Sequence, residues 1–497
     1  MQNSLNTYMQ HLTINIRKNN ILFILYLLAI ACPVHAIDFP DLPVLHIETV
    51  NGEIPTCTVV YAPEGCLGVS ITDNAYVPGR MTVTLKGDTL YDSKEYVKDV
   101  SGMRIKRRGN STGAYLNQHP YKIKLSKKYD LLERGDKTFR HKEWLLLSMY
   151  TWNPKMTYQE SNILNVAGTI VSKIVRHDWT PEFEFVNVVL NGEYQGMYYL
   201  MESVDKGDHR VVLDDTGFLI EDDTFWWNEE VYFRTEQQQI QSAYTYKYPD
   251  DDDVTDSIQT VIQQYMNDFE SALYDNGNVD NYIDYESFAK WLLIHDILGT
   301  YDVAGCNRFV YKYDYDKDNP FASKLKMGPA WDYDSAFKSD NWSAIHVSDT
   351  WFYYSALFRR EDFVNTYLNL WKQVRPTILT ELENRFDDFL NKYQYVFDES
   401  MKLHQTKYPG EGKATLVFQV DEMLQKINQR ITTLDELMTQ YGYSSHIGNI
   451  AAEQARLTDI VNMQGMSMKT ADSRQLKPEI YIFRFSDGQN KKIRISE

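Results

Sequence analysis

Cysteine is scarce in this chain, with four residues in 497. Cys32 lies in an N-terminal apolar segment, and the other three are too few for a disulfide scaffold. In an oxidising compartment Cys57 and Cys66 are placed to close a small loop, which leaves Cys306 unpaired. The histidines do not show zinc-ligand spacing. We therefore expect a packed core, rather than a set of disulfides or a zinc ion, to hold the fold together.

Basic residues are outnumbered by acidic ones. The chain has 51 Lys and Arg against 69 Asp and Glu, which gives a formal charge of −18. Proteins that bind nucleic acids in general present a basic surface, so no nucleic-acid partner is expected. A basic protein partner would suit this acidic composition, although net charge does not locate a binding patch.

Long apolar runs are also absent, except for residues 21–30. Two basic residues precede this run, and residues 34–36 resemble a small-residue cleavage site. Because the run is too short to span a bilayer comfortably, we expect residues 1–36 to be a secretory signal peptide. The alternatives are an uncleaved membrane anchor and a lipoprotein anchored at Cys32. We expect export, and no stable transmembrane span in the mature chain.

Alternating apolar and polar residues dominate the first half of the chain. In residues 37–97 apolar and polar residues alternate in short runs separated by turns, which predicts a small β-module. Asn191-Gly192 is a strong hairpin signal between predicted strands at 183–190 and 196–201. Strand patterns continue to about residue 215.

Helical spacing takes over after residue 248. The acidic run at 250–253 is most simply a solvated loop, because it lacks the ligand spacing of a calcium loop. Helices are predicted near 158–174, 256–269, 288–297, 365–404 and 420–441, and short paired strands at 309–313 and 324–327. We therefore expect an α+β fold with a main domain over residues 98–445, strand-rich to about 215 and helical after it. The last part, 446–497, returns to a hairpin pattern and is expected to form a short β tail.

Acidic and amide residues follow the helix that is predicted at 288–297. Asp302 and Asn307 are separated by four residues, and a predicted hairpin then returns the chain to Asp332 and Asp334. This order suits phosphoryl transfer, which needs a base for the acceptor hydroxyl and oxygen ligands for magnesium. We assign Asp302 as the base and Asn307 and Asp332 as metal ligands, with Asp334 either a further ligand or a support. Alone, an Asp and an Asn in a loop are more often turn residues.

An upstream loop and strand offer contacts for phosphates. The segment Arg108-Gly-Asn-Ser-Thr-Gly113 supplies small residues and backbone donors, with Arg108 and Ser111 as candidate ligands. Lys122 and Lys124 project to one face of the next predicted strand, where one of them is placed to meet a nucleotide. Each signal is weak by itself, because glycine turns and lysines on edge strands are common.

Together these motifs resemble the spore-coat protein H (CotH) kinase family, over roughly residues 98–440. The motifs that carry the resemblance stand in one order: Arg108–Thr112, Tyr121–Leu125, Leu190–Tyr198 with Glu202, Asp302-x4-Asn307 and Trp331-Asp-Tyr-Asp334. The resemblance implies a divergent bilobal protein-kinase-like fold. It also implies transfer of the γ-phosphoryl group of ATP, with Mg²⁺, to Ser or Thr of a protein acceptor.

The resemblance further implies roles for single residues. It supports Asp302 as the base and Asn307 and Asp332 as metal ligands. It favours Lys124 over Lys122 as the lysine that contacts phosphate, and it places Glu202 near the nucleotide. The protein would then be a secreted or cell-surface kinase of a bacterium.

The segment 151–160 departs from the family, because an Arg that many relatives carry there is absent. Glu160 is either a partner for the active-site lysine or a carboxylate on a helix surface. The main alternative function is a non-catalytic (pseudokinase) surface or envelope protein that keeps the fold as a binding scaffold. A metal-dependent phosphoesterase using the same carboxylates is a third. The sequence names neither the acceptor nor the oligomeric state.

Overall fold

The computed structural model describes residues 39–443 without 150–161, 239–240, 301–305, 338–344, 346–352 and 413, together with the strands at 457–462, 480–485 and 490–494. The expected signal peptide therefore lies outside the described residues. The chain divides into two compact units, the first ending at Leu434 and the second beginning at Asp435. Both helices and sheets are present, so the predicted α+β class is confirmed.

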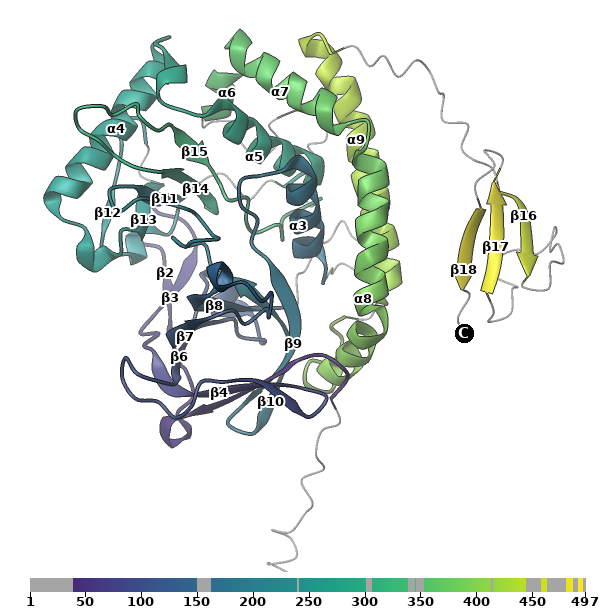
Figure 1. Ribbon diagram of the computed structural model, residues 1–497. Helices are drawn as coiled ribbons and strands as arrows, with labels where there is room; N and C mark the ends of the chain where they lie inside the picture. The colour runs from purple at the N-terminus through teal and green to yellow at the C-terminus, as the bar shows by residue number, and fades with distance from the viewer. Residues whose placement is uncertain are drawn as a thin grey trace, which may run out of the picture. The chain divides into compact units, whose positions relative to one another are not determined.

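An eight-stranded sheet forms the N-terminal part of the first unit (Figure 1). Its order is β1-β9-β10-β8-β7-β6-β4-β5, and β1 also pairs with β4. This extra pairing closes seven of the strands into a ring and leaves β5 outside. The strands are β1 (Val44–Thr49), β4 (Val77–Leu85), β5 (Asp88–Asp92), β6 (Met103–Arg107), β7 (Tyr121–Tyr129), β8 (His141–Ser148), β9 (Phe183–Leu190) and β10 (Glu193–Glu202).

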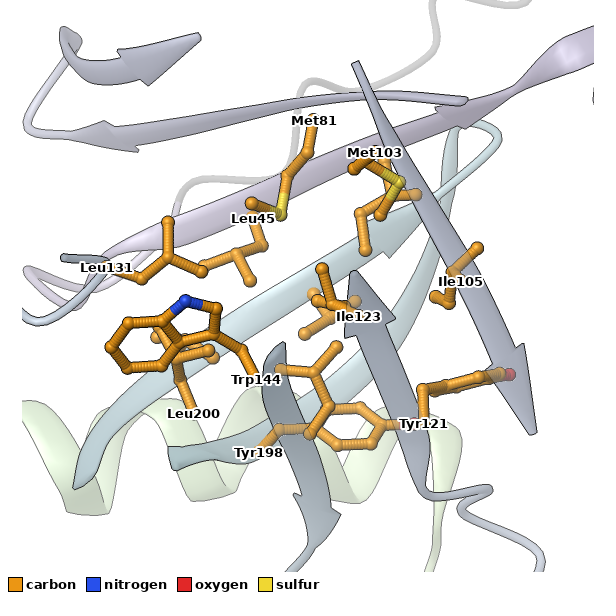
Figure 2. Close-up of a cluster of buried hydrophobic side chains, with 14 of the residues drawn as sticks. Leu45, Met81, Met103, Ile105, Tyr121, Ile123, Leu131, Trp144, Tyr198 and Leu200 are labelled. Carbon is orange, nitrogen blue, oxygen red and sulfur yellow. The ribbon is translucent and has the colours of Figure 1, made fainter. Parts of the chain in front are cut away.

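The inside of the ring is a hydrophobic core, shown in Figure 2. Because side chains alternate between the two faces of a strand, every second residue of β7 points inward: Tyr121, Ile123 and Leu125 are buried there. Lys122 and Lys124 therefore lie on the outer face. The same alternation predicted from the sequence fixes which side of the sheet carries charge.

The segment 37–97 contributes strands to this same ring. β1 pairs in parallel with β9 and antiparallel with β4, and β4 pairs with β6. The expected N-terminal module thus shares its sheet with the strand-rich part of the main domain, while its boundary at residue 97 stays a prediction. The strands β2 (Thr58–Tyr61) and β3 (Val69–Thr72) form a separate pair. Cys57 and Cys66 are both free thiols, so the small disulfide-closed loop is not formed.

The predicted hairpin at Asn191-Gly192 is confirmed. Both residues have positive φ, 51° and 80°, which the two central residues of a type I′ turn require. They join β9 directly to β10, whose first residue, Glu193, pairs with Leu190. The hairpin brings Met201 opposite Phe183 at the start of β9, and Glu202, at the end of β10, beside Glu182.

A second sheet and most of the helices follow. The sheet has the order β12-β13-β11-β14-β15, and α8 packs on both α3 and β10 (Figure 1). The strands are β11 (Phe218–Asp223), β12 (Tyr232–Phe233), β13 (Ala243–Tyr248), β14 (Arg308–Lys312) and β15 (Leu325–Met327). The helices are α2 (Ser111–Tyr115), α3 (Leu164–Val175), α4 (Asp256–Tyr274), α5 (Tyr285–Leu298), α6 (Tyr353–Leu357), α7 (Glu361–Val374), α8 (Ile378–Lys407) and α9 (Leu416–Met438).

One predicted helix is divided in the structure. The pattern over 365–404 forms two helices, because α7 ends at Val374 and α8 begins at Ile378. Pro376 lies between them, and its ring disfavours helical geometry at the residue before it. The acidic run 250–253 forms an exposed turn before α4, as predicted.

The second unit contains a three-stranded sheet of β16 (Leu457–Asn462), β17 (Ile480–Phe485) and β18 (Asn490–Arg494). Its β17–β18 hairpin matches the hairpin predicted for the tail. Within the part of the chain that the structure describes, no helix combines the length and apolar character needed to cross a membrane.

Candidate functional site

Four cations line up on the outer face of β6 and β7. Arg104 pairs across the strands with Lys124, and Lys106 with Lys122. Arg104 and Lys106 both lie over the ring of Tyr76, at 5.1 and 5.0 Å from its centre. Cross-strand neighbours of like charge repel one another, so this face requires anionic partners.

Glu143 on β8 supplies the nearest anion. Its two carboxylate oxygens lie 2.9 Å from Lys122 Nζ and 2.7 Å from Lys124 Nζ. Burial alone would raise the pKa of Glu143, but the two lysines outweigh burial and hold the pKa below its usual value. For Lys124 burial lowers the pKa, and the contact with Glu143 outweighs it, so the pKa is raised. Lys124 therefore stays charged, and the side chains of both lysines are about a third exposed.

Arg108 and two aspartates share one small cavity. Arg108, Asp332 and Asp334 all line it, along with Thr112 from α2 and Asn165 from α3. Its volume is about 70 Å³, which is room for a few atoms such as a phosphate group or a hydrated ion rather than a nucleoside. Burial lowers the pKa of Arg108, and the charge of Asp332 opposes that shift. The structure thus brings together three of the residues that the sequence singled out.

The Trp331–Asp334 segment is held against α3. The ring of Tyr333 is fully buried over Gly168, and the backbone N–H of Tyr333 lies 3.5 Å from Asn165 Oδ1. Asp332 has a φ of 54°, in the left-handed region that few residues other than glycine adopt. Backbone strain of this kind costs about 1–3 kcal/mol and occurs mainly where surrounding packing enforces it, often at functional sites.

Asn307 also has a left-handed backbone, with a φ of 58°. Its backbone N–H donates to Glu221 Oε1 at 3.1 Å, and Glu221 in turn lies 2.9 Å from Lys247 Nζ. The next residue, Arg308, forms an ion pair with Asp222 in which both side chains are buried. Two successive acidic residues of β11 therefore fix Arg308, the first residue of β14, and Asn307 directly before it.

Glu221 also links Asn307 to the cavity. The charge of Glu221, like that of Asp332, raises the pKa of Arg108 against the effect of burial. Arg108 therefore lies within electrostatic range of both carboxylates. Through Glu221 and Arg108, the structure connects the Asn307 backbone to Asp332.

Three further predicted residues do not line this cavity in the described part of the chain. Asp302 lies outside the described residues, as does Glu160. Ser111 is exposed at the start of α2 and does not line the cavity, whereas its neighbour Thr112 does. Among the residues that the structure describes, no three His, Cys, Asp or Glu side chains converge as a ready metal site. The assignments of Asp302, Asn307, Asp332 and Asp334 to base and metal roles therefore stay predictions.

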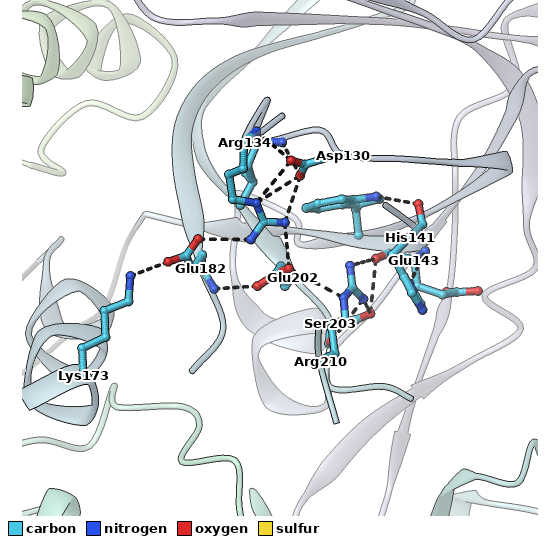
Figure 3. Close-up of polar contacts among 11 residues, drawn as sticks. Asp130, Arg134, His141, Glu143, Lys173, Glu182, Glu202, Ser203 and Arg210 are labelled. Carbon is cyan, nitrogen blue, oxygen red and sulfur yellow. Dashed lines mark hydrogen bonds and ion pairs between the residues drawn. The ribbon is translucent and has the colours of Figure 1, made fainter. Parts of the chain in front are cut away.

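Glu202 does not share the outer face of Lys122 and Lys124, and Figure 3 shows it among Arg134, Glu182 and Arg210. Tyr198 and Leu200 on β10 point into the ring. Because side chains alternate along a strand, Glu202, two residues after Leu200, points to the same side. Its carboxylate lies 2.9 Å from Arg134 Nη2 and accepts the backbone N–H of Glu182 at 3.0 Å, and the residue has no exposed surface. This placement does not favour the predicted nucleotide contact, and it gives Glu202 a part in a buried ion-pair network instead.

Sequence reasoning missed several residues of the site. Glu143, Glu221 and Asn165 all face predicted site residues, yet none belongs to a motif. The only signal available for Glu143 was its position in an alternating strand pattern. Glu143 pairs with Lys124 because of the register between β7 and β8, and the sequence of neither strand alone predicts that register.

The fold and the site define an α+β protein in which an arginine and two aspartates line a small cavity, next to a lysine-bearing sheet face. The family model described as CotH kinase protein matches residues 105–434, well over half of the chain. The chain therefore belongs to the CotH kinase protein family. A search of curated proteins found no match.

Proposed function

We propose that this protein is a secreted atypical protein kinase that transfers the γ-phosphoryl group of ATP to Ser or Thr of a protein acceptor. The observation that carries the proposal is the shared cavity of Arg108, Asp332 and Asp334, within the region that matches the kinase family. A phosphoryl-transfer site needs positioned charge of both signs more than covalent chemistry. This cavity and the neighbouring lysines supply both signs.

Each residue has a distinct part in the proposed reaction. Lys124, with Lys122, binds the phosphates, and Arg108 neutralises charge on the transferred group. The carboxylate of Asp302 accepts the proton of the acceptor hydroxyl while that oxygen bonds to the γ-phosphorus and ADP leaves. General-base help of this kind is typically worth ~10²–10⁴ in rate.

Asp332, Asp334 and the amide of Asn307 fit magnesium, because hard cations of this kind prefer oxygen ligands. Bound there, the ion would neutralise charge on the phosphates. The left-handed backbones of Asn307 and Asp332 support a constrained role for both residues. A basic acceptor suits the acidic chain, and the N-terminal sequence supports export.

The test uses purified residues 37–497. ATP binding, measured by calorimetry, should require a divalent cation, and Asp332→Ala should remove that requirement. Transfer of labelled phosphate to a basic protein or to the chain itself should fall at least a hundredfold in Asp302→Ala. Asp387→Ala, an exposed carboxylate on α8, serves as the matched control and should change neither property. Absence of ATP binding in the unchanged chain would overturn the proposal.

A non-catalytic scaffold is the second candidate. The altered segment at 151–160 favours it, because the Arg of many relatives is missing there. Metal-dependent nucleotide binding without transfer, across a panel of acceptors, would support this candidate over the kinase.

A further inference from the structure

The strands β2 and β3 form a two-stranded sheet of their own, so in the described part of the chain each has an outer edge that no further strand covers. Other elements occupy the outer edge of β3: α2 lies against the strand, and Asn228 Nδ2 donates to the carbonyl oxygen of Ile71 at 2.9 Å. Among the described residues, the outer edge of β2 has no such cover. Val59 and Tyr61 on this strand are 38% and 71% exposed.

The backbone of β2 directs hydrogen-bonding groups to this outer edge. The N–H of Ala62 donates to the carbonyl of Gly68, and in an antiparallel sheet hydrogen-bonded and non-hydrogen-bonded pairs of residues alternate. Val59 and Tyr61 lie an odd number of residues from Ala62, so their N–H and C=O groups point away from β3. Ile71, the partner of Val59, confirms the alternation, since its carbonyl is bonded on the opposite edge. An exposed row of donors and acceptors of this kind is a template for another strand.

The outer edge of β2 lacks the usual protection against pairing. Soluble proteins cover open edges or place charged residues, proline or a bulge there. The strand Thr58-Val-Val-Tyr61 contains neither a charge nor a proline, and its register with β3 is regular. Pro55 and Pro63 flank it, and because they lack an N–H they limit the open stretch to a short one. Exposed edges with apolar side chains bind extended peptides in several protein families.

The hairpin and its flanks carry only negative charge. Residues 50–76 include three carboxylates, those of Glu53, Glu64 and Asp73, and neither Lys nor Arg. All three side chains belong to exposed residues. A docking segment that carries Lys or Arg would be attracted here, and an acidic one would be repelled.

The acidic character continues on the segment that holds the hairpin. Trp227 Nε1 donates to the carbonyl oxygen of Leu67 at 3.1 Å, so this segment lies against the turn between β2 and β3. Glu229 and Glu230 follow Trp227 closely, and both are exposed. The hairpin therefore has carboxylates in its own sequence and in the segment next to it.

The hairpin is also joined to the segment that lines the smaller cavity. Ser70 Oγ on β3 donates to Asn110 Oδ1 at 2.7 Å. Asn110 stands between Arg108 and Thr112, which line that cavity together with Asp332. A segment docked on β2 is thus held by a hairpin that is bonded directly to the proposed phosphate-binding loop.

We propose that the outer edge of β2 binds an extended, basic segment of the acceptor protein as an added strand. The backbone of that segment would pair with the outward N–H and C=O groups of Val59 and Tyr61. Its apolar side chains would lie beside theirs, and its Lys or Arg side chains would face the surrounding carboxylates. The identity of the occupant rests on the proposed kinase function, whereas the binding itself requires no nucleotide.

The probe is a fluorescently labelled peptide, Lys-Val-Lys-Val-Lys-Val-Lys, added to residues 37–497 without nucleotide. Binding is measured by fluorescence anisotropy. One comparison peptide has every internal amide N-methylated, which removes the donors for strand pairing, and the other has Glu in place of Lys. The basic peptide should bind at least fivefold more tightly than either, since one hydrogen bond is worth about 1 kcal/mol. Equal binding of the N-methylated peptide, or no binding of the basic peptide, would overturn the proposal.

Tyr61→Lys tests the location. Because Tyr61 is 71% exposed, the change should keep the fold and weaken the basic peptide at least fivefold by repulsion and lost apolar contact. Tyr395→Lys, at a position 75% exposed on α8, is the matched control and should leave binding unchanged. Val59→Pro removes an outward N–H but no hydrogen bond within the hairpin, and should weaken the peptide similarly. Peptide binding that survives Tyr61→Lys would overturn the proposal.

Docking and catalysis can be separated. Asp332→Ala should leave peptide binding unchanged, while Tyr61→Lys should raise KM for a basic acceptor protein at least fivefold and keep kcat. An unchanged KM in Tyr61→Lys would overturn the docking inference alone. Docking without any phosphate transfer by the unchanged chain would contradict the kinase proposal and leave the docking of a basic segment intact. A dimer in sedimentation that Tyr61→Lys separates and the peptide does not would assign the edge to a second copy, and would overturn the inference.

Discussion

The ring of Tyr333 packs directly on Gly168, at a point where a Cβ on residue 168 would lie 2.1 Å from a ring carbon. Only glycine allows this approach. Because Tyr333 stands between Asp332 and Asp334, its contact with α3 fixes the backbone from which both carboxylates project. The helix thus sets the position of the acidic wall of the cavity.

Gly168→Ala should disturb that wall. Alanine favours a helix over glycine by about 1 kcal/mol, but the overlap with Tyr333 is expected to outweigh this gain. Overpacking of a core typically costs about 1–3 kcal/mol, so urea unfolding should show a net loss of up to about 2 kcal/mol. The loss should shrink when Tyr333→Leu is introduced as well, in a double-mutant cycle. If the losses of the two single variants simply add in the double variant, the contact between Gly168 and Tyr333 would be contradicted.

Glu143→Gln should release the two lysines that share its carboxylate. The pKa of Lys124 is raised because the contact with Glu143 outweighs burial, so it should fall in this variant. Titration of isotope-labelled lysines by NMR would measure the shift. If Lys124 binds phosphate as proposed, transfer activity should fall about tenfold, the worth of a hydrogen bond between charged groups. Glu193→Gln, exposed in the β9–β10 turn, should change neither value.

Asp222→Ala should destabilise the first unit strongly. It leaves Arg308 buried without its carboxylate partner, and breaking a buried ion pair typically costs about 3–5 kcal/mol. The exposed pair of Lys324 and Asp280, at 3.0 Å, provides the control. Asp280→Ala should cost less than about 1 kcal/mol in the same urea titration. Similar losses in both variants would refute the distinction.

Glu270 should make stability depend on pH. The residue is buried on α4, accepts a hydrogen bond from Tyr353 Oη at 2.6 Å, and has a pKa raised by burial to about 7. In the unfolded chain a glutamate titrates near 4.3, so this group's stabilising effect is complete below pH ~4 and is lost as the pH rises through 7. Between pH 5 and 8 the loss amounts to about 2–3 kcal/mol.

Glu270→Gln should remove most of this slope. The free energy of unfolding, measured in urea at pH 5 and pH 8, should then differ less in the variant than in the unchanged chain. Glu193→Gln should keep the original slope. A slope that persists in Glu270→Gln would assign it to other carboxyl groups.

Local patterns predicted much of this fold, because they depend on neighbours in sequence. The Asn191-Gly192 turn and the helix spacing around α5 are examples, and both appear where expected. Closure of the ring was not predicted, since β1 pairs with β9 some 140 residues away and no local signal encodes that register. The family resemblance over most of the chain was confirmed.

For the site, too, the sequence predicted the residues that lie in motifs but not those whose contacts depend on the fold. Motif residues such as Arg108 and Asp332 do share a cavity. The predicted nucleotide contact of Glu202 stays a prediction that its burial does not favour, because the motif gives its position in sequence but not which face of β10 it occupies. Glu143 was missed because its ion pairs are with Lys122 and Lys124 on the neighbouring strand β7, and they depend on how the two strands pair.

The closed ring also bears on how the protein can be shortened. The family match begins at residue 105, after β1 and β4, so a fragment cut at that limit would lack two of the seven strands. The exposed backbones of β9 and β6 would then offer unpaired N–H and C=O groups, the usual starting point for aggregation between chains. Soluble fragments should therefore begin before Val44.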